Sequence, residues 1–173
     1  MRARGAVWGP FILWVWMAAA SAQEPSRAER FADWEVVCSS TLHAESSTPP
    51  SKTNCQAVQR LTAQGSEETV FALTVVRDDQ RVPVAIVSIP LGGYIARGIE
   101  LSVDGKKPYK VLVETCNAAG CHAGFPLSGQ IAKEFRSGKL ASFRLWSAKD
   151  KSADVTVSLK GFAEALARLE RSS

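Results

Sequence analysis

The chain has 173 residues, of which 46% are hydrophobic and 22% charged, and its formal net charge is +4. That length is enough for one domain with a sizeable core. The positive charge does not indicate nucleic-acid binding, because no run of Lys and Arg with interleaved aromatic residues accompanies it.

The N-terminus has the pattern of a secretory signal peptide over residues 1–22. Arg2 and Arg4 form a basic start, residues 7–20 are almost entirely apolar, and Ala20-Ser21-Ala22 matches the small-residue cleavage pattern. The apolar stretch is shorter than the ~20 residues that span a bilayer. We therefore predict cleavage after the alanine at position 22, with no stable membrane span afterwards. Losing the two arginines lowers the net charge from +4 to +2.

The start of the predicted mature chain contains two strands. Residues 23–30 are polar and predict a disordered lead-in, and residues 31–173 then form a single domain. Residues 31–38 alternate as a strand that puts Trp34, Val36 and Cys38 on one face. A Ser-, Thr- and Pro-rich loop follows over 39–53, and 55–62 predicts the second strand.

The middle of the chain predicts hairpins. Residues 70–77 and 81–89 read as two strands joined by a turn at 78–80, and Pro83 favours an edge position or a bulge for the second. Residues 99–103 alternate cleanly, and Asp104-Gly105 is a tight-turn signal into a strand over 109–116. A further strand is predicted over 121–127, after a turn at 117–120.

Two helices and two strands complete the pattern. Ser128 is placed to cap a short helix that ends at Gly138, with Ile131, Ala132 and Phe135 facing inward. A terminal helix is predicted over 162–171 from the apolar spacing of Phe162, Ala165, Leu166 and Leu169. Strands are predicted over 142–146 and 154–159. About eight short strands separated by turn signals predict an all-β fold, a β-sandwich with one or two short helices.

The four cysteines form two local pairs downstream of the export signal, Cys38 with Cys55 and Cys116 with Cys121. An even number of cysteines in an exported chain predicts two disulfides. We therefore expect a periplasmic or secreted protein. The chain-entropy model assigns ~3 kcal/mol to a loop of the size that the first pair closes.

The sharpest local motif is the segment that runs from Cys116 to Cys121 and His122. Two cysteines followed by histidine are typical of haem attachment, but four residues separate these cysteines instead of two. The predicted mature chain also has no methionine, and His43 is its only other histidine, as a second axial ligand. A zinc site or a redox-active pair is the other reading, and a structural disulfide explains the same residues more simply.

The remaining polar motifs do not predict an active site. Asp78-Asp79 and Asp104 lie in turns, and Gly92-Gly93 lacks the pattern of a phosphate-binding loop. Trp34 and Trp146 lie in strand patterns that favour the core, with an exposed ligand platform as the alternative. We assign no catalytic, cofactor-binding or metal-ligating residue, and we expect no enzyme.

Several segments in order along the chain resemble the invasion-associated locus B family. These are the Phe-x-Asp-Trp-x-Val-x-Cys opening at 31–38, Cys-x-x-x-Gln at 55–59, Pro-Leu-Gly at 90–92, the apolar strand ending in Asp-Gly at 99–105, the cysteine pair at 116–121 and Ser-Leu-x-Gly-Phe at 158–162. The resemblance implies an exported bacterial protein of the periplasm or envelope with an immunoglobulin-like β-sandwich. No catalytic residues are known to us for this family, so none carries over.

Together these observations predict a non-enzymatic binding module whose ligand is an unidentified envelope or host protein. The family's name implies a contribution to host-cell invasion or to envelope function. The alternative function is that of a periplasmic redox or haem-linked protein that uses Cys116, Cys121 and His122.

Overall fold

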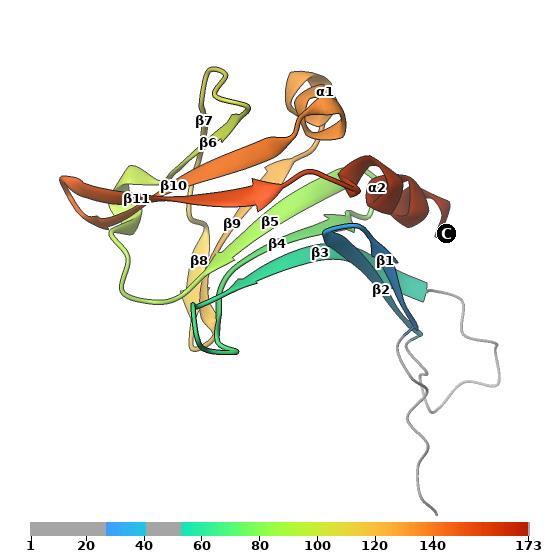
Figure 1. Ribbon diagram of the computed structural model, residues 1–173, viewed down its shortest axis with the longest axis horizontal. Coiled ribbons are helices and arrows are strands. Elements are labelled where there is room, and N and C mark those ends of the chain that lie inside the picture. The colour runs from blue at the N-terminus through green and yellow to red at the C-terminus, as the bar shows by residue number, and fades with distance from the viewer. Residues whose placement is uncertain (1–26, 41–52, 173) are drawn as a thin grey trace, which may run out of the picture.

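The protein is a two-layered β-sandwich with two helices (Figure 1), seen in a computed structural model that describes residues 27–40 and 53–172. The larger sheet has seven strands in the order β1 (Arg27–Phe31), β2 (Trp34–Ser40), β3 (Thr53–Thr62), β4 (Thr69–Arg77), β5 (Pro83–Ile89), β9 (Gly120–Pro126) and β8 (Thr115–Asn117). The smaller sheet has four strands in the order β11 (Lys151–Ser158), β10 (Leu140–Ala148), β6 (Ile99–Val103) and β7 (Tyr109–Val111). Neighbouring strands are antiparallel throughout. The all-β, sandwich-like prediction is confirmed, with eleven strands in the described residues where about eight were expected.

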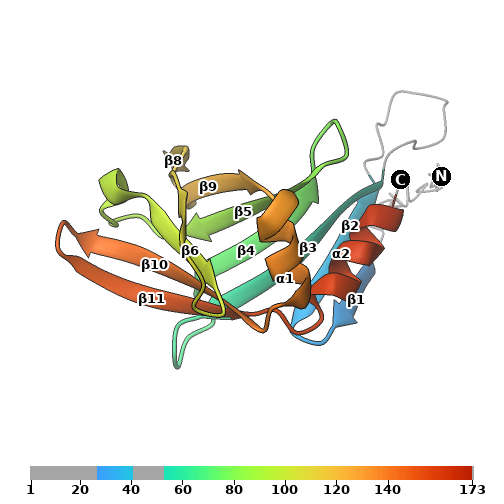
Figure 2. The same cartoon turned by 90° about the horizontal axis from the view of Figure 1, so that it is seen from above.

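Two helices cover the part of the larger sheet that the smaller sheet leaves open (Figure 2). They are α1 (Gly129–Ser137) and α2 (Phe162–Arg171), and α2 packs on β1, β2, β3 and β4. The buried residues of α2 are the four that helical spacing predicts, Phe162, Ala165, Leu166 and Leu169. No helix among the described residues is long and apolar enough to cross a membrane.

Aromatic rings fill the core between the layers. Trp34 is fully buried, and its ring lies 4.9 Å from that of Phe162 in an edge-on contact. The indole N–H of Trp34 donates a hydrogen bond of 2.9 Å to the carbonyl oxygen of Ser158, so its polar atom is satisfied inside the core. Phe71 and Phe143 join the two sheets, with ring centroids 5.0 Å apart. Each such ring pair contributes about 1 kcal/mol beyond the area that it buries.

The turn before α2 requires glycine. Gly161 has φ 86°, and a Cβ on it would stand 2.0 Å from the carbonyl oxygen of Phe31. Only a residue without a side chain fits this left-handed position against another backbone. The close approach brings the start of α2 against the end of β1. Further along, the guanidinium of Arg168 donates hydrogen bonds of 2.9–3.0 Å to both carboxylate oxygens of Glu29.

Aspartates hold two of the turns, in agreement with their predicted positions. The Asp78 carboxylate accepts the backbone N–H groups of Gln80 and Val82 between β4 and β5. The Asp104 carboxylate accepts the backbone N–H groups of Leu140 and Lys139, which lowers the pKa of that carboxyl below its ordinary 3.8. Each side chain therefore stabilises a specific connection by accepting N–H groups that would otherwise need water.

The structure corrects three strand predictions. Residues 31–38 do not form one strand, because β1 ends at residue 31, a turn follows, and β2 begins at residue 34. Residues 109–116 do not form one strand, because β7 ends at Val111 in the smaller sheet and β8 begins at Thr115 in the larger one. Strand β5 is neither at an edge nor bulged, since it pairs with both β4 and β9. Pro83 is tolerated because it is the first residue of the strand, where its missing N–H interrupts no interior pairing.

The described residues also correct the expected lead-in. Residues 27–30 are not disordered, because they belong to β1, which pairs along its whole length with β2. The predicted signal peptide, residues 23–26 and most of the predicted 39–53 loop, including His43, lie outside the described residues.

Candidate functional site

All four cysteines are in disulfides on the inner side of the larger sheet. Cys38 and Cys55 are direct partners across β2 and β3, and Cys116 and Cys121 are direct partners across β8 and β9. The first pair packs partly buried against the core, with the guanidinium of Arg168 from α2 4.0 Å from the Cys38 sulfur. Each bond therefore ties two strands that are already hydrogen-bonded neighbours.

His122 follows Cys121 in the sequence but lies on the opposite face of β9. Successive side chains of a strand point to opposite faces, so the buried Cys121 faces inward and His122 faces outward. On the outer face, His122 Nδ1 lies 3.0 Å from the Ser88 hydroxyl of β5. The three residues that the sequence brings together are thus divided between two faces. In residues 27–40 and 53–172 no group of three or more His, Cys, Asp and Glu side chains is placed to hold a metal ion.

The outer face of the larger sheet is apolar along two adjacent rows. Both helices and the smaller sheet lie on its other side, so no described element covers this face (Figure 1). In register across the strands, one row contains Val58, Thr74, Ile86 and Gly124, and the next contains Val76, Val84 and Pro126. The outer face of the smaller sheet differs in chemistry, because it carries the charged row Glu100, Arg144 and Asp154.

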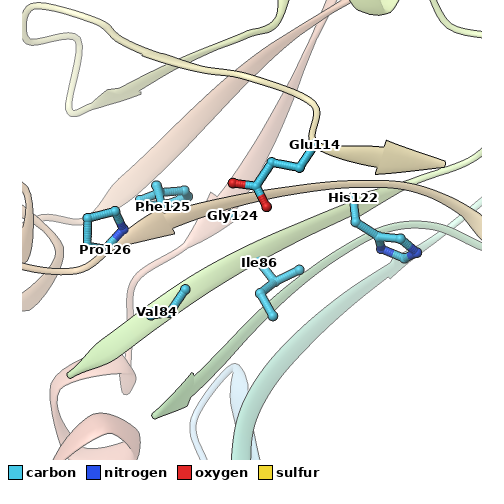
Figure 3. A pocket seen from close by; sticks show the side chains of 7 residues that line it. All are labelled: Val84, Ile86, Glu114, His122, Gly124, Phe125 and Pro126. Carbon is cyan, nitrogen blue, oxygen red and sulfur yellow. The ribbon is translucent and has the colours of Figure 1, made fainter. Parts of the chain in front are cut away.

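A hollow of about 490 Å³ opens on this apolar face where β5 meets β9 (Figure 3). It is lined by Val84, Ile86, Glu114, His122, Gly124, Phe125 and Pro126. The Glu114 side chain reaches over Gly124, where a Cβ would stand 3.3 Å from its Oε2 atom. Figure 3 places His122 and Pro126 toward opposite ends of the lining. A glycine at position 124 keeps the floor low beneath the carboxylate.

The backbone of Glu114 is fixed, while its carboxylate has no partner among the described residues. Its N–H donates to the carbonyl oxygen of His122 at 2.9 Å, just before β8 begins. The side chain is exposed, and no described residue offers it a hydrogen bond or an ion pair. By contrast, Arg144 and Asp154 on the other sheet form two hydrogen bonds of 2.8 and 3.0 Å with each other. An unpaired carboxylate beside an apolar floor suits a cation on an alkyl stem, as in Lys or Arg.

The contact between Ser88 and His122 is one of the two contacts that a hydrolytic site of the serine–histidine type needs. A serine nucleophile needs a histidine base whose other ring nitrogen is oriented by a third group. No described residue bonds to the second ring nitrogen of His122, and the nearby Glu114 carboxylate lies over Gly124 instead. The geometry therefore supports ligand binding better than acyl transfer.

Sequence reasoning did not single out Glu114, Ser88 or the apolar floor. The available signal was the continuous apolar run at 84–87, because successive side chains of a strand face opposite sides and half of this run must lie outside the core. That run does not reveal that β5 and β9 are neighbours, or that the residue before β8 overhangs them.

Comparison with known proteins gives a family and a fold. The family model described as "Invasion associated locus B (IalB) protein" matches residues 34–170. The solved crystal structure of invasion associated protein B from Bartonella henselae is similar, with a TM-score of 0.68 over 83% of this chain and 96% of that chain. The two sequences are 23% identical, so this likeness concerns the fold. No curated protein sequence matches the chain.

Proposed function

This chain belongs to the Invasion associated locus B (IalB) family, and from that premise we propose that it is an exported, non-enzymatic protein of the periplasm or envelope that acts as a binding module. Its ligand is a protein segment that presents a basic side chain next to aliphatic ones. Because the family is named for invasion, we propose that the protein contributes to host-cell invasion or to envelope function.

Export is supported by the leader pattern of residues 1–22 and by the use of every cysteine in a disulfide. Disulfides persist in oxidising compartments such as the bacterial periplasm and are rare in the cytosol. Mass spectrometry of the protein isolated from its own cells tests this part. A mature N-terminus at Gln23 supports export with cleavage, and four free thiols in the isolated protein contradict it.

Binding is supported above all by the unpaired carboxylate of Glu114 over an apolar hollow. The floor formed by Val84, Ile86 and Gly124 accommodates an aliphatic stem, and the carboxylate accepts hydrogen bonds from the cationic head. A charge-assisted contact of this kind contributes roughly 1.5–3 kcal/mol when both partners lose water. The hollow is open, so we expect the lower part of that range.

Photocrosslinking in living cells tests the binding role. A photoreactive amino acid replaces Pro126 at the rim of the hollow, and a control replaces Glu67 in the turn between β3 and β4, at the opposite end of the sheet. We expect a discrete adduct from position 126 that is absent from position 67. The change Glu114→Lys should abolish this adduct, while Glu67→Lys should leave it intact.

Two results would contradict the proposed role. The first is equal labelling from both positions, since this would indicate nonspecific encounters. The second is an adduct that persists with Glu114→Lys, because the carboxylate would then contribute nothing to recognition.

A further inference from the structure

Large exposed hydrophobic side chains concentrate at one end of the protein. The described residues contain five of them, and three lie within one short segment, Leu91, Tyr94 and Ile95, with 57%, 37% and 46% of their surface exposed. A fourth, Leu112, lies beside the same segment, because a Cβ on Gly98 would stand 3.5 Å from its side chain. Single exposed apolar residues are ordinary, but a cluster marks a contact surface.

The segment is held in place by the β10–β11 hairpin. The N–H of Tyr94 donates to the carbonyl oxygen of Trp146 at 2.7 Å. The guanidinium of Arg97 stacks 4.0 Å from the centre of the Trp146 ring and donates to the carbonyl oxygen of Lys149 at 2.8 Å. Figures 1 and 2 both place this hairpin tip at the end of the molecule opposite α2. The apolar side chains are thus presented on a fixed support.

Basic side chains surround this cluster. Lys149 and Lys151 lie at the hairpin tip, and Arg97 of the neighbouring segment contacts it. With the one acidic residue there, Asp150, these three cations leave a local charge of +2. Beyond them, Lys110 of β7 is balanced by its direct cross-strand neighbour Glu100 of β6. We call Leu91, Tyr94, Ile95 and these three basic residues the basic apolar end.

We propose that the basic apolar end binds the surface of a bilayer that contains anionic phospholipid. Its aliphatic side chains project from a loop at a molecular tip and enter the boundary between headgroups and acyl chains, with Tyr94 at the headgroup level. The lysines and Arg97 complement the lipid phosphates, because each basic residue near an anionic surface strengthens binding roughly fivefold. This surface is separate from the hollow at Glu114, which is acidic, so neither proposal depends on the other.

Co-sedimentation with vesicles tests the proposal. The protein is purified in the form that its own cells produce, and mass spectrometry determines its N-terminal residue. All variants are prepared with the same N-terminus. We expect binding to vesicles of phosphatidylglycerol and phosphatidylethanolamine, weaker binding in high salt, and little binding to phosphatidylcholine alone. The variant L91S/I95S should bind at least about tenfold more weakly, since two aliphatic side chains no longer leave water. Leu140→Ser is the matched control, because Leu140 is 49% exposed and lies at the start of β10, where its N–H donates to Asp104, away from the basic apolar end.

Two charge-reversal variants and a hydrogen-exchange measurement complete the experiment. K149E/K151E should weaken binding to anionic vesicles by at least about tenfold, while K133E/K160E, the same charge change elsewhere, should cost much less. Hydrogen exchange on vesicles should slow in residues 90–97 and 146–151, whatever the N-terminus contributes. Unchanged exchange there, equal binding of L91S/I95S and the parent, or binding to a soluble polyanion such as heparin with none to vesicles would each overturn the proposal.

Discussion

Opening the Cys38–Cys55 disulfide alone should lower the free energy of unfolding by about 3 kcal/mol. The two cysteines are 17 positions apart, and the chain-entropy model gives roughly 3 kcal/mol for a loop of this length. Cys116 and Cys121 are only 5 positions apart, and the same model gives roughly 2 kcal/mol for them. The longer loop should therefore contribute more, although both bonds join strands that are already paired.

Two double variants isolate the two bonds. In Cys116→Ala/Cys121→Ala only the Cys38–Cys55 bond remains, and urea unfolding with and without reductant measures that bond with unchanged side chains. With a slope of about 1.5 kcal/mol per molar urea, the midpoint should fall by about 2 M on reduction. In Cys38→Ala/Cys55→Ala the reductant opens only the other bond, and the midpoint should fall by about 1.3 M.

The comparison can refute the reasoning in two ways. An unchanged midpoint for the first variant would show that the bond does not restrict the unfolded chain. A larger shift for the shorter loop would show that native contacts, and not loop closure, set the stabilisation. The same samples test the redox alternative, since a Cys116–Cys121 bond that survives mild reductant in mass mapping contradicts a redox role.

Three further changes test the packing, the turn and the hollow. Phe162→Ala removes a fully buried ring that contacts two other aromatic rings, and it should cost about 3–5 kcal/mol in urea unfolding. Asp104→Asn should lower the melting temperature at neutral pH, because the pKa of Asp104 is depressed in the folded state and its charged carboxylate stabilises the turn above pH 3.8. The difference in melting temperature from the parent should disappear as the pH falls through the folded pKa. A difference that stays constant with pH would contradict this. Gly124→Ala puts a methyl group 3.3 Å from the flexible, exposed Glu114 side chain, so the free energy of unfolding should change by less than about 0.5 kcal/mol. The photoadduct at Pro126 should nevertheless weaken. An undiminished adduct would contradict ligand binding in the hollow.

Local patterns were sufficient where an element has one buried side. The alternation of Trp34, Val36 and Cys38 placed all three on the core face, and helical spacing identified every buried residue of α2. Both patterns follow from the fixed periods of strand and helix, which a single segment contains in full.

Features that depend on contacts between distant segments could not be predicted from such local patterns. Residues 109–116 contain neither Gly nor Pro, and the apolar stretch 111–113 runs straight through the crossing, so nothing in the sequence marks the change from one sheet to the other. The prediction of an edge strand or a bulge at Pro83 was wrong because Pro83 is the first residue of β5, where proline is also tolerated inside a sheet. The hollow depends on which strands become neighbours, and this is a property of the assembled sheet.

The Cys116–Cys121 disulfide closes only a short loop, but it helps to position the Glu114 carboxylate at the hollow. Strand β8 has three exposed residues and, among the described strands, pairs only with β9, so few contacts hold it there beyond the Cys116–Cys121 bond and its ladder hydrogen bonds. Glu114 lies two positions before Cys116, and its N–H bonds to the strand that carries the second cysteine. A bond on the inner face therefore fixes the chain that carries a carboxylate on the outer face. Its loss should displace Glu114 and weaken binding at the hollow more than its roughly 2 kcal/mol of stability would indicate.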